Sequence, residues 1–220
     1  MTLTYHLQVV NFLAALLLLI SFAMLSQRRI AGLITLFAWQ GAALATSAAL
    51  VGWSTGQHHL YYSAALTLVL KVIAMPWFFF RIVKKLEMDR DVEPMINIPT
   101  TMLIGIALVI FAFNLTQPIS ELSGTVMRST LGIALACVLL AFLMMITRSK
   151  AIPQVIGFLA IENSLFFAAT SATYGMPLVV ELGVALDVMV GVLVMGIFFF
   201  QIRETFDSLD LKHMEKLKEK

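Results

Sequence analysis

Long apolar runs separated by short polar breaks make up most of the chain. Each run has about 20 residues or more, the length that a helix needs to cross the ~30 Å hydrocarbon core of a bilayer. Outside a closed barrel, only helices satisfy every backbone hydrogen bond in lipid. The pattern therefore predicts an all-α integral membrane protein with seven transmembrane helices, at residues 7–26, 31–53, 60–82, 97–116, 126–147, 152–174 and 178–201.

The distribution of basic residues predicts how these helices are oriented. Of the 15 Lys and Arg residues, Lys71 lies within a span and Arg128 in an outer break, and the other 13 lie in alternate breaks or in the tail. Loops rich in Lys and Arg remain in the cytoplasm. We therefore expect a multi-pass protein of a bacterial or archaeal cytoplasmic (inner) membrane, with the N-terminus outside and the C-terminus in the cytoplasm.

Composition narrows the possible chemistry. Apolar residues make up 60% of the chain and charged residues 13%, against about 25% charged in soluble domains. Seven spans leave no loop long enough for a soluble domain. The single cysteine, Cys137, lies in an apolar run, which excludes a disulfide framework and a cysteine-based metal motif. We expect no catalytic residue, cofactor, metal or nucleic-acid partner, and we expect contact with lipid.

Three charged residues lie near the centres of predicted spans: Lys71, Glu162 and Asp187. A charge at this depth costs about 2.5–3.5 kcal/mol on insertion scales, and such residues usually line an ion or substrate pathway. Burial favours a neutral carboxyl group and a nearby ammonium favours a charged one, so a carboxyl group here can bind and release protons. Two interpretations stay open: a proton or ion pathway that also includes Glu181 near the outer end, or static buried pairs such as Lys71 with Asp187.

Polar and helix-breaking residues accompany these charges. Gln40 and Asn163 are expected to support the pathway by holding bridging waters, although polar side chains also join helices by hydrogen bonds. Pro76 follows Lys71 by about one turn. Because proline frees a backbone carbonyl and clashes with the preceding turn, it predicts a kink in the third span.

An internal repeat is also visible. Residues 34–41 resemble residues 156–163, and the third and seventh spans both end in a Phe-Phe-Phe run. The repeat predicts two parallel three-helix units joined by a central helix. The expected domains are an N-terminal unit at 1–96, a linking helix at 97–124, a C-terminal unit at 125–203 and a cytoplasmic tail at 204–220.

Two motifs carry a resemblance to known families. Ala160-Ile-Glu162 and the run that begins at Asp187 resemble the K-type subunit of respiratory complex I and of multisubunit cation/proton antiporters, which has an acidic residue at each place. The whole chain, with Ile161-Glu-Asn163 and the stretch from Tyr174 to Gly183, is similar to component E of the hydrogenase-4 type. Asp187 departs from the K-type pattern, which has glutamate there.

The resemblance implies a non-catalytic membrane subunit of a complex-I-like membrane-bound hydrogenase of the formate hydrogenlyase type. Its partners would be other membrane subunits of a hydrogenase or antiporter-like complex, and its mid-membrane carboxylates would contribute to proton or sodium translocation. Two alternatives remain: a stand-alone secondary ion transporter, and a purely structural subunit of the membrane arm.

Overall fold

The computed structural model describes residues 2–85, 95–121 and 125–173, together with residues 183, 189–191, 194 and 196. Regular structure in these residues is helical, apart from isolated bridge positions at Arg29 and Arg148. Among the described residues, six helical segments are long and apolar enough to cross a membrane: Gln8–Ser26, Ile30–Thr55, His59–Lys84, Ile98–Pro118, Thr130–Thr147 and Ala151–Thr170. The prediction of an all-α integral membrane protein is confirmed. Most of the seventh predicted span lies outside the described residues.

The helices follow the predicted runs closely. The elements are α1 (Thr2–Ser26), α2 (Ile30–Thr55), α3 (His59–Thr67), the π-helical segment η1 (Leu68–Ala74), α4 (Met75–Lys85), α5 (Ile98–Glu121), α6 (Thr125–Thr147) and α7 (Ala151–Thr173). The third span is thus α3, η1 and α4 in succession. α2 ends at Gly56, whose φ of 69° is the left-handed conformation that glycine adopts freely after a helix.

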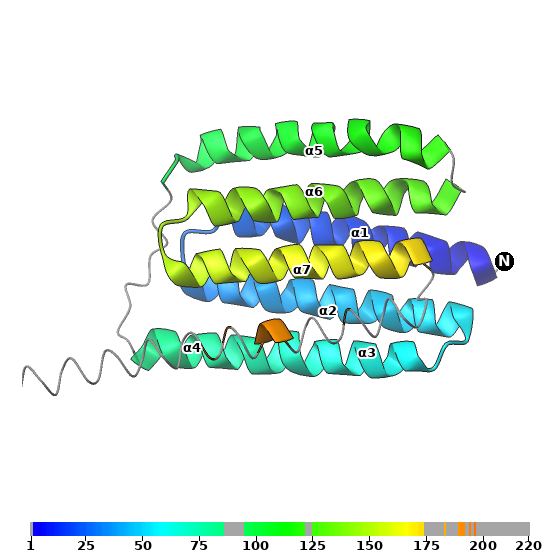
Figure 1. The fold of residues 1–220 in the computed structure, drawn as a ribbon, viewed down its shortest axis with the longest axis horizontal. Helices are drawn as coiled ribbons and strands as arrows, with labels where there is room; N and C mark the ends of the chain where they lie inside the picture. The colour runs from blue at the N-terminus through cyan, green and yellow to red at the C-terminus, as the bar shows by residue number, and fades with distance from the viewer. Residues whose placement is uncertain are drawn as a thin grey trace, which may run out of the picture. The chain divides into compact units, whose positions relative to one another are not determined.

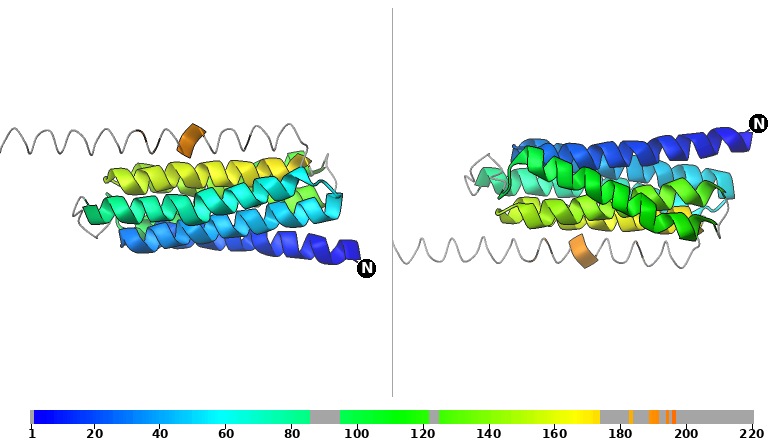
Figure 2. Two further views of the ribbon diagram at one scale, coloured as in Figure 1. Left: turned by 90° about the horizontal axis from the view of Figure 1, so that it is seen from below. Right: turned by 90° about the horizontal axis from the view of Figure 1, so that it is seen from above.

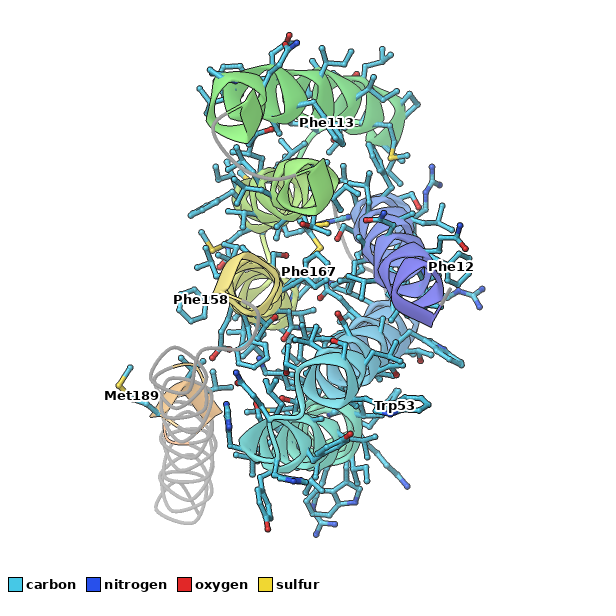
Figure 3. All side chains as sticks on the ribbon, turned by 90° about the vertical axis from the view of Figure 1, so that its right-hand side faces the viewer. Phe12, Trp53, Phe113, Phe158, Phe167 and Met189 are labelled. Carbon is cyan, nitrogen blue, oxygen red and sulfur yellow. The ribbon has the colours of Figure 1, made fainter. Side chains whose placement is uncertain are left out.

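Two helical hairpins pack side by side. α1 and α2 form one hairpin and α6 and α7 the other, with α1 against α6 and α2 against α7. Figure 1 shows α1 and α6 running in one direction and α2 and α7 in the opposite one. α5 packs on α6 and α1, and the third span packs on α2. The views along and across the helices show the same neighbours (Figures 2 and 3).

Small side chains allow the two hairpins to approach closely. The central cluster is rich in alanine and contains Ala14, Leu17, Ala43, Leu44, Ala48, Ala64, Ala134, Cys137, Phe166 and Phe167. Small residues are typical of helix contacts in membranes, where close packing replaces the hydrophobic effect as the driving force. The buried thiol of Cys137 belongs to this packing.

Large apolar side chains cover the outer surface. Figure 3 shows Phe167 within the bundle and Phe12, Trp53 and Phe158 on its outside. Burial differs most between α5 and α7: 17% of the α5 span is buried within the structure, against 67% of the α7 span. An apolar exterior of this kind suits contact with lipid chains or with other membrane subunits.

The chain forms two compact units, Met1–Val184 and Ala185–Lys220. All the helices named above belong to the first unit. In the second, residues 189–191, 194 and 196 are helical. The four-part division predicted from the repeat, with boundaries at 96, 124 and 203, stays a prediction.

Candidate functional site

Lys71 and Glu162 form an ion pair in the middle of the bundle. Lys71 Nζ lies 3.7 Å from Glu162 Oε2, and the two side chains are 4% and 5% exposed. Lys71 lies near the midpoint of the span His59–Lys84, and Glu162 near the middle of Ala151–Thr170. The separation exceeds the usual 2.7–3.2 Å of a hydrogen bond. Of the central charges that the sequence marked, the structure therefore brings these two together.

An irregular turn and a glycine position Lys71. The residue lies within η1, where the amide of Met75 donates to the carbonyl of Leu70, five residues back. This widened turn directly precedes Pro76, where the sequence predicted a kink; π-turns are a recognised cause of such irregularities and are frequent at functional sites. Opposite, a Cβ atom on Gly41 would lie 3.0 Å from Lys71 Cβ. Glycine at this position lets the lysine stem approach α2 closely.

A chain of polar side chains crosses the bundle next to the ion pair. Asn163 Nδ2 donates to Gln40 Oε1 over 3.1 Å, Gln40 Nε2 donates to Ser21 Oγ over 3.3 Å, and Ser21 Oγ donates to the carbonyl of Leu17 over 2.9 Å. All three polar side chains are buried. The chain links α7, α2 and α1, so it ties the two hairpins together at the level of the charges.

Sequence reasoning placed Gln40 and Asn163 beside the charges but did not identify Ser21. Its only sequence signal was a lone hydroxyl in an apolar run. Glu181 and Asp187, the other two predicted pathway residues, lie outside the described residues. Within the part of the chain that the structure describes, no group of three or more His, Cys, Asp or Glu side chains could hold a metal ion.

Arg148 is a second residue whose position the sequence did not reveal. It lies in the short α6–α7 connection, where a solvent-exposed loop residue was expected, yet it is only 1% exposed. Its Nη2 donates to the carbonyl of Leu25, in the last turn of α1, over 2.6 Å. Burial lowers the pKa of its guanidinium below the ordinary value. A cation near a helix C-terminus is favourable because carbonyl oxygens and the helix dipole concentrate negative charge there.

The charges divide the bundle into two ends. One end holds residues 27–29, residues 148–150 and the end of α4, with Arg28, Arg29, Arg81, Lys84, Arg148 and Lys150; we call it the basic end. The other holds the α2–α3 connection at residues 56–58, which has no Lys or Arg; we call it the neutral end. The structure thus gathers most of the described cations that flank the spans at one end, on the left in Figure 1. The exception is Arg128, near the start of α6 at the opposite end.

Comparisons with known proteins give two levels of similarity. The chain is 34% identical over 211 residues to uncharacterized protein Rv0085 of Mycobacterium tuberculosis, covering 96% of each chain. It is 22% identical over 210 residues to hydrogenase-4 component E of Escherichia coli K12, covering 96% of this chain and 97% of that one. Component E of Shigella flexneri matches to the same extent. No family model matches the chain, and no solved structure matches it.

Proposed function

The chain belongs to the family of the mycobacterial protein Rv0085, and we propose that this chain is a membrane subunit of a membrane-bound hydrogenase complex. The proposal rests on hydrogenase-4 component E, a more distant relative that this chain matches over almost the whole length of both proteins. Six apolar helices support the membrane location. The subunit itself is not catalytic. Its partners are the other membrane subunits of a complex-I-like assembly of the formate hydrogenlyase type.

Within that complex the proposed role is to help move a proton or a sodium ion across the membrane. The observation that carries this proposal is the buried Lys71–Glu162 pair. Two opposite charges about 4 Å apart attract by about 4 kcal/mol at an effective dielectric constant of 20. Much of that attraction is lost when Glu162 takes up a proton. Protonation of Glu162 therefore changes the force on Lys71, which the irregular turn η1 allows to move.

A charged pair that is only structural is a weaker explanation. Replacing a buried ion pair by packed apolar residues is often neutral or stabilising. The neighbouring Asn163–Gln40 bond already joins α7 to α2 without any charge. Asp187 and Glu181 are proposed as further pathway residues. We also propose that the basic end faces the cytoplasm, with the N-terminus outside, because cytoplasmic loops are enriched in Lys and Arg.

Membership of a complex is tested by purification. An affinity tag on the chain in its native membrane, solubilised in mild detergent, is expected to recover hydrogenase subunits and antiporter-like membrane subunits in fixed ratio. Recovery of the chain alone, with intact ion transport after reconstitution, would support a stand-alone secondary transporter instead.

The ion-moving role is tested by Glu162→Gln, which keeps the shape and hydrogen-bonding capacity of the side chain but removes its charge. In vesicles that contain the assembled complex, proton uptake or membrane potential is measured against electron transfer in the same sample. Fewer ions per electron are expected, or slower electron transfer if the two are strictly coupled. Asp187→Asn is expected to act in the same direction and Glu181→Gln more weakly. A normal ion-to-electron ratio in both Glu162→Gln and Asp187→Asn would make these carboxyl groups structural.

A further inference from the structure

Three buried hydroxyl groups differ from the other hydroxyls of the spans. Ser and Thr side chains in membrane helices usually donate to a carbonyl one turn back, as Ser164 does to Ala160 over 2.8 Å. Ser47, Ser63 and Thr67 are 1%, 3% and 1% exposed. Their Oγ atoms have no hydrogen-bond partner in the described part of the chain. A buried polar group of this kind calls for a partner, and a bound water molecule is one that can supply the missing hydrogen bond.

Two of these hydroxyls lie in line with Lys71. Ser63, Thr67 and Lys71 follow one another at intervals of four residues, so they share one face of the third span. Successive positions on such a face are about 6 Å apart along the helix. One water molecule that makes two hydrogen bonds of about 2.8 Å spans that distance. The spacing therefore suits a single file of water that ends at the ammonium group.

Ser47 reaches the same level from the neighbouring helix. α2 and the third span run in opposite directions, and two close approaches fix their register: Gly41 faces Lys71, and Gly52 faces Leu60. Counting along α2 between these contacts places Ser47 at the level between Ser63 and Thr67. A water molecule at that level that bonds a hydroxyl of each helix would have two of the two to four polar partners that a buried water needs.

Toward the basic end, the same helices present only apolar side chains to the interior. They are Ile30, Leu33, Ile34 and Phe37 on α2, Met75, Phe78, Phe79 and Ile82 on α4, and Ile152, Ile156 and Leu159 on α7. Toward the neutral end the interior also contains apolar side chains, among them Ala43, Leu44 and Ala48 on α2, Ala64 on α3, and Phe166 and Phe167 on α7, but there the three hydroxyls lie among them. The ion pair therefore has buried hydroxyls without a protein partner on one side, whereas on the other side the buried side chains of α2, α4 and α7 are all apolar.

We propose that Ser47, Ser63 and Thr67 hold a file of water molecules that connects the Lys71–Glu162 pair to the neutral end of the bundle, while the basic half is sealed. The proposal deepens the proposed function, on which it rests for the use of the file. The Lys71 ammonium group passes one proton to the Glu162 carboxylate and takes one back from the last water of the file. Each water passes one proton inward and receives one from the neutral end, so the ammonium group and the file end unchanged and the carboxylate becomes a carboxylic acid.

The chain offers a matched test, because it has one cysteine. In a Cys137→Ala background of the full complex, Thr67→Cys and Met75→Cys place thiols four residues from Lys71 on opposite sides. Ser63→Cys and Phe79→Cys repeat the pair at eight residues. The probe is the silver ion, a thiol reagent about the size of a water molecule. It is applied to sealed vesicles of each orientation, and the thiols that remain are counted by maleimide labelling after denaturation.

Silver applied at the neutral end is expected to modify Thr67→Cys at least about tenfold faster than Met75→Cys, and Ser63→Cys at least about tenfold faster than Phe79→Cys. A tenfold ratio of rates corresponds to a difference of about 1.4 kcal/mol in the free energy of access. Met75→Cys and Phe79→Cys replace large side chains, so any cavity they leave favours the opposite result. Equal rates in both halves, or faster reaction at Met75→Cys and Phe79→Cys, would overturn the proposal.

A second set of variants removes the hydroxyls without adding a thiol. Thr67→Val and Ser63→Ala are expected to slow ion movement relative to electron transfer. The control is Thr46→Val, because Thr46 is exposed and its hydroxyl already bonds to the carbonyl of Ala42. If silver reaches Thr67→Cys but Glu162→Gln couples normally, the water file stands and the proposed relay is wrong. If silver fails to reach it and Glu162→Gln is uncoupled, the relay stands and the file is wrong.

Discussion

The two halves of the bundle on either side of the Lys71–Glu162 pair both contain fully buried side chains but differ in the chemistry of some of them. In the half toward the basic end, Phe37 and Phe79 are both 0% exposed. In the half toward the neutral end, Ser47 and Thr67 are both 1% exposed. Burial of an unsatisfied hydroxyl costs about 1–3 kcal/mol, so the second half is less stable than apolar packing would make it. The comparison teaches that, among the described residues, the buried hydroxyls without a protein partner all lie on one side of the ion pair.

The polar chain from Asn163 to Ser21 shows that the fold can satisfy a buried polar side chain when the contact is structural. Gln40 uses both ends of its amide, as acceptor from Asn163 and as donor to Ser21. The hydroxyls of Ser47, Ser63 and Thr67 lie at a comparable depth and lack such protein contacts within the described residues. The difference supports a role for water in one region and direct helix contact in the other.

The largest effect is expected in a labelling test of which half faces which side of the membrane, because each cysteine is either labelled in intact cells or not. In the Cys137→Ala background, His58→Cys lies at the neutral end and Ser149→Cys at the basic end. Because basic loops stay in the cytoplasm, a membrane-impermeant maleimide is expected to label His58→Cys in intact cells and Ser149→Cys only after permeabilisation.

A reporter fused after Lys220 checks the same topology and is expected to be cytoplasmic. Labelling of Ser149→Cys in intact cells would reverse the orientation. A periplasmic reporter, with the maleimide pattern unchanged, would instead show that the number of spans after α7 is even.

The next largest effect is expected at the boundary between the halves. Lys71→Met leaves the Glu162 carboxylate in a low dielectric without the ammonium 3.7 Å away, which costs about 3–5 kcal/mol. The amount of assembled complex and the free energy of unfolding in detergent should both fall. The double variant Lys71→Met with Glu162→Gln removes both charges and is expected to recover part of the loss. Additive losses in the double variant would show that the two groups act independently.

The sequence predicted the depth of the central charges but not their pairing. Depth follows from counting residues along apolar runs, so Lys71 and Glu162 were both placed at mid-membrane. Their mutual direction depends on the rotation of each helix, and the π-turn η1 alters that rotation for every residue after Leu68. For this reason either Glu162 or Asp187 could be expected to face Lys71. The structure places Glu162 beside Lys71, and Asp187 lies outside the described residues.

Arg148 and Ser21 show a different limit. Arg148 follows an apolar run and precedes Ser149 and Lys150, a pattern typical of a solvent-exposed loop, yet the close packing of α6 against α1 encloses it. Ser21 has no polar neighbour within four residues before it in the sequence, so its contact with Gln40 depends on the α1–α2 register alone. Contacts between helices depend on tertiary packing, which a local sequence pattern does not predict.

A smaller effect is expected where α2 approaches the boundary. Gly41→Ala places a methyl group 3.0 Å from Lys71 Cβ, and overpacking of a buried site costs about 1–3 kcal/mol. The shift should also displace Lys71 from Glu162, so coupling of ion movement to electron transfer is expected to fall with stability. Thr46→Val on the exposed face of the same helix serves as the control and should change neither. Unchanged stability and coupling in Gly41→Ala would show that the third span moves aside freely.

The smallest effect is expected in the polar chain that joins the hairpins. Asn163→Leu removes the donor of the 3.1 Å bond to Gln40 Oε1. Hydrogen bonds between membrane helices contribute about 0.6 kcal/mol on average and up to about 1.7 kcal/mol, because the separated helices find other partners. A loss in that range is expected for the unfolding free energy in detergent. Gln40→Leu should cost somewhat more, since it also removes the donor to Ser21. The double variant should cost less than the sum, because the two residues share one bond.

A result in which Asn163→Leu abolishes ion movement while the loss of stability stays within this range would show that Asn163 acts in the pathway with Glu162. The division between a structural polar chain and a water-holding half would then have to be redrawn.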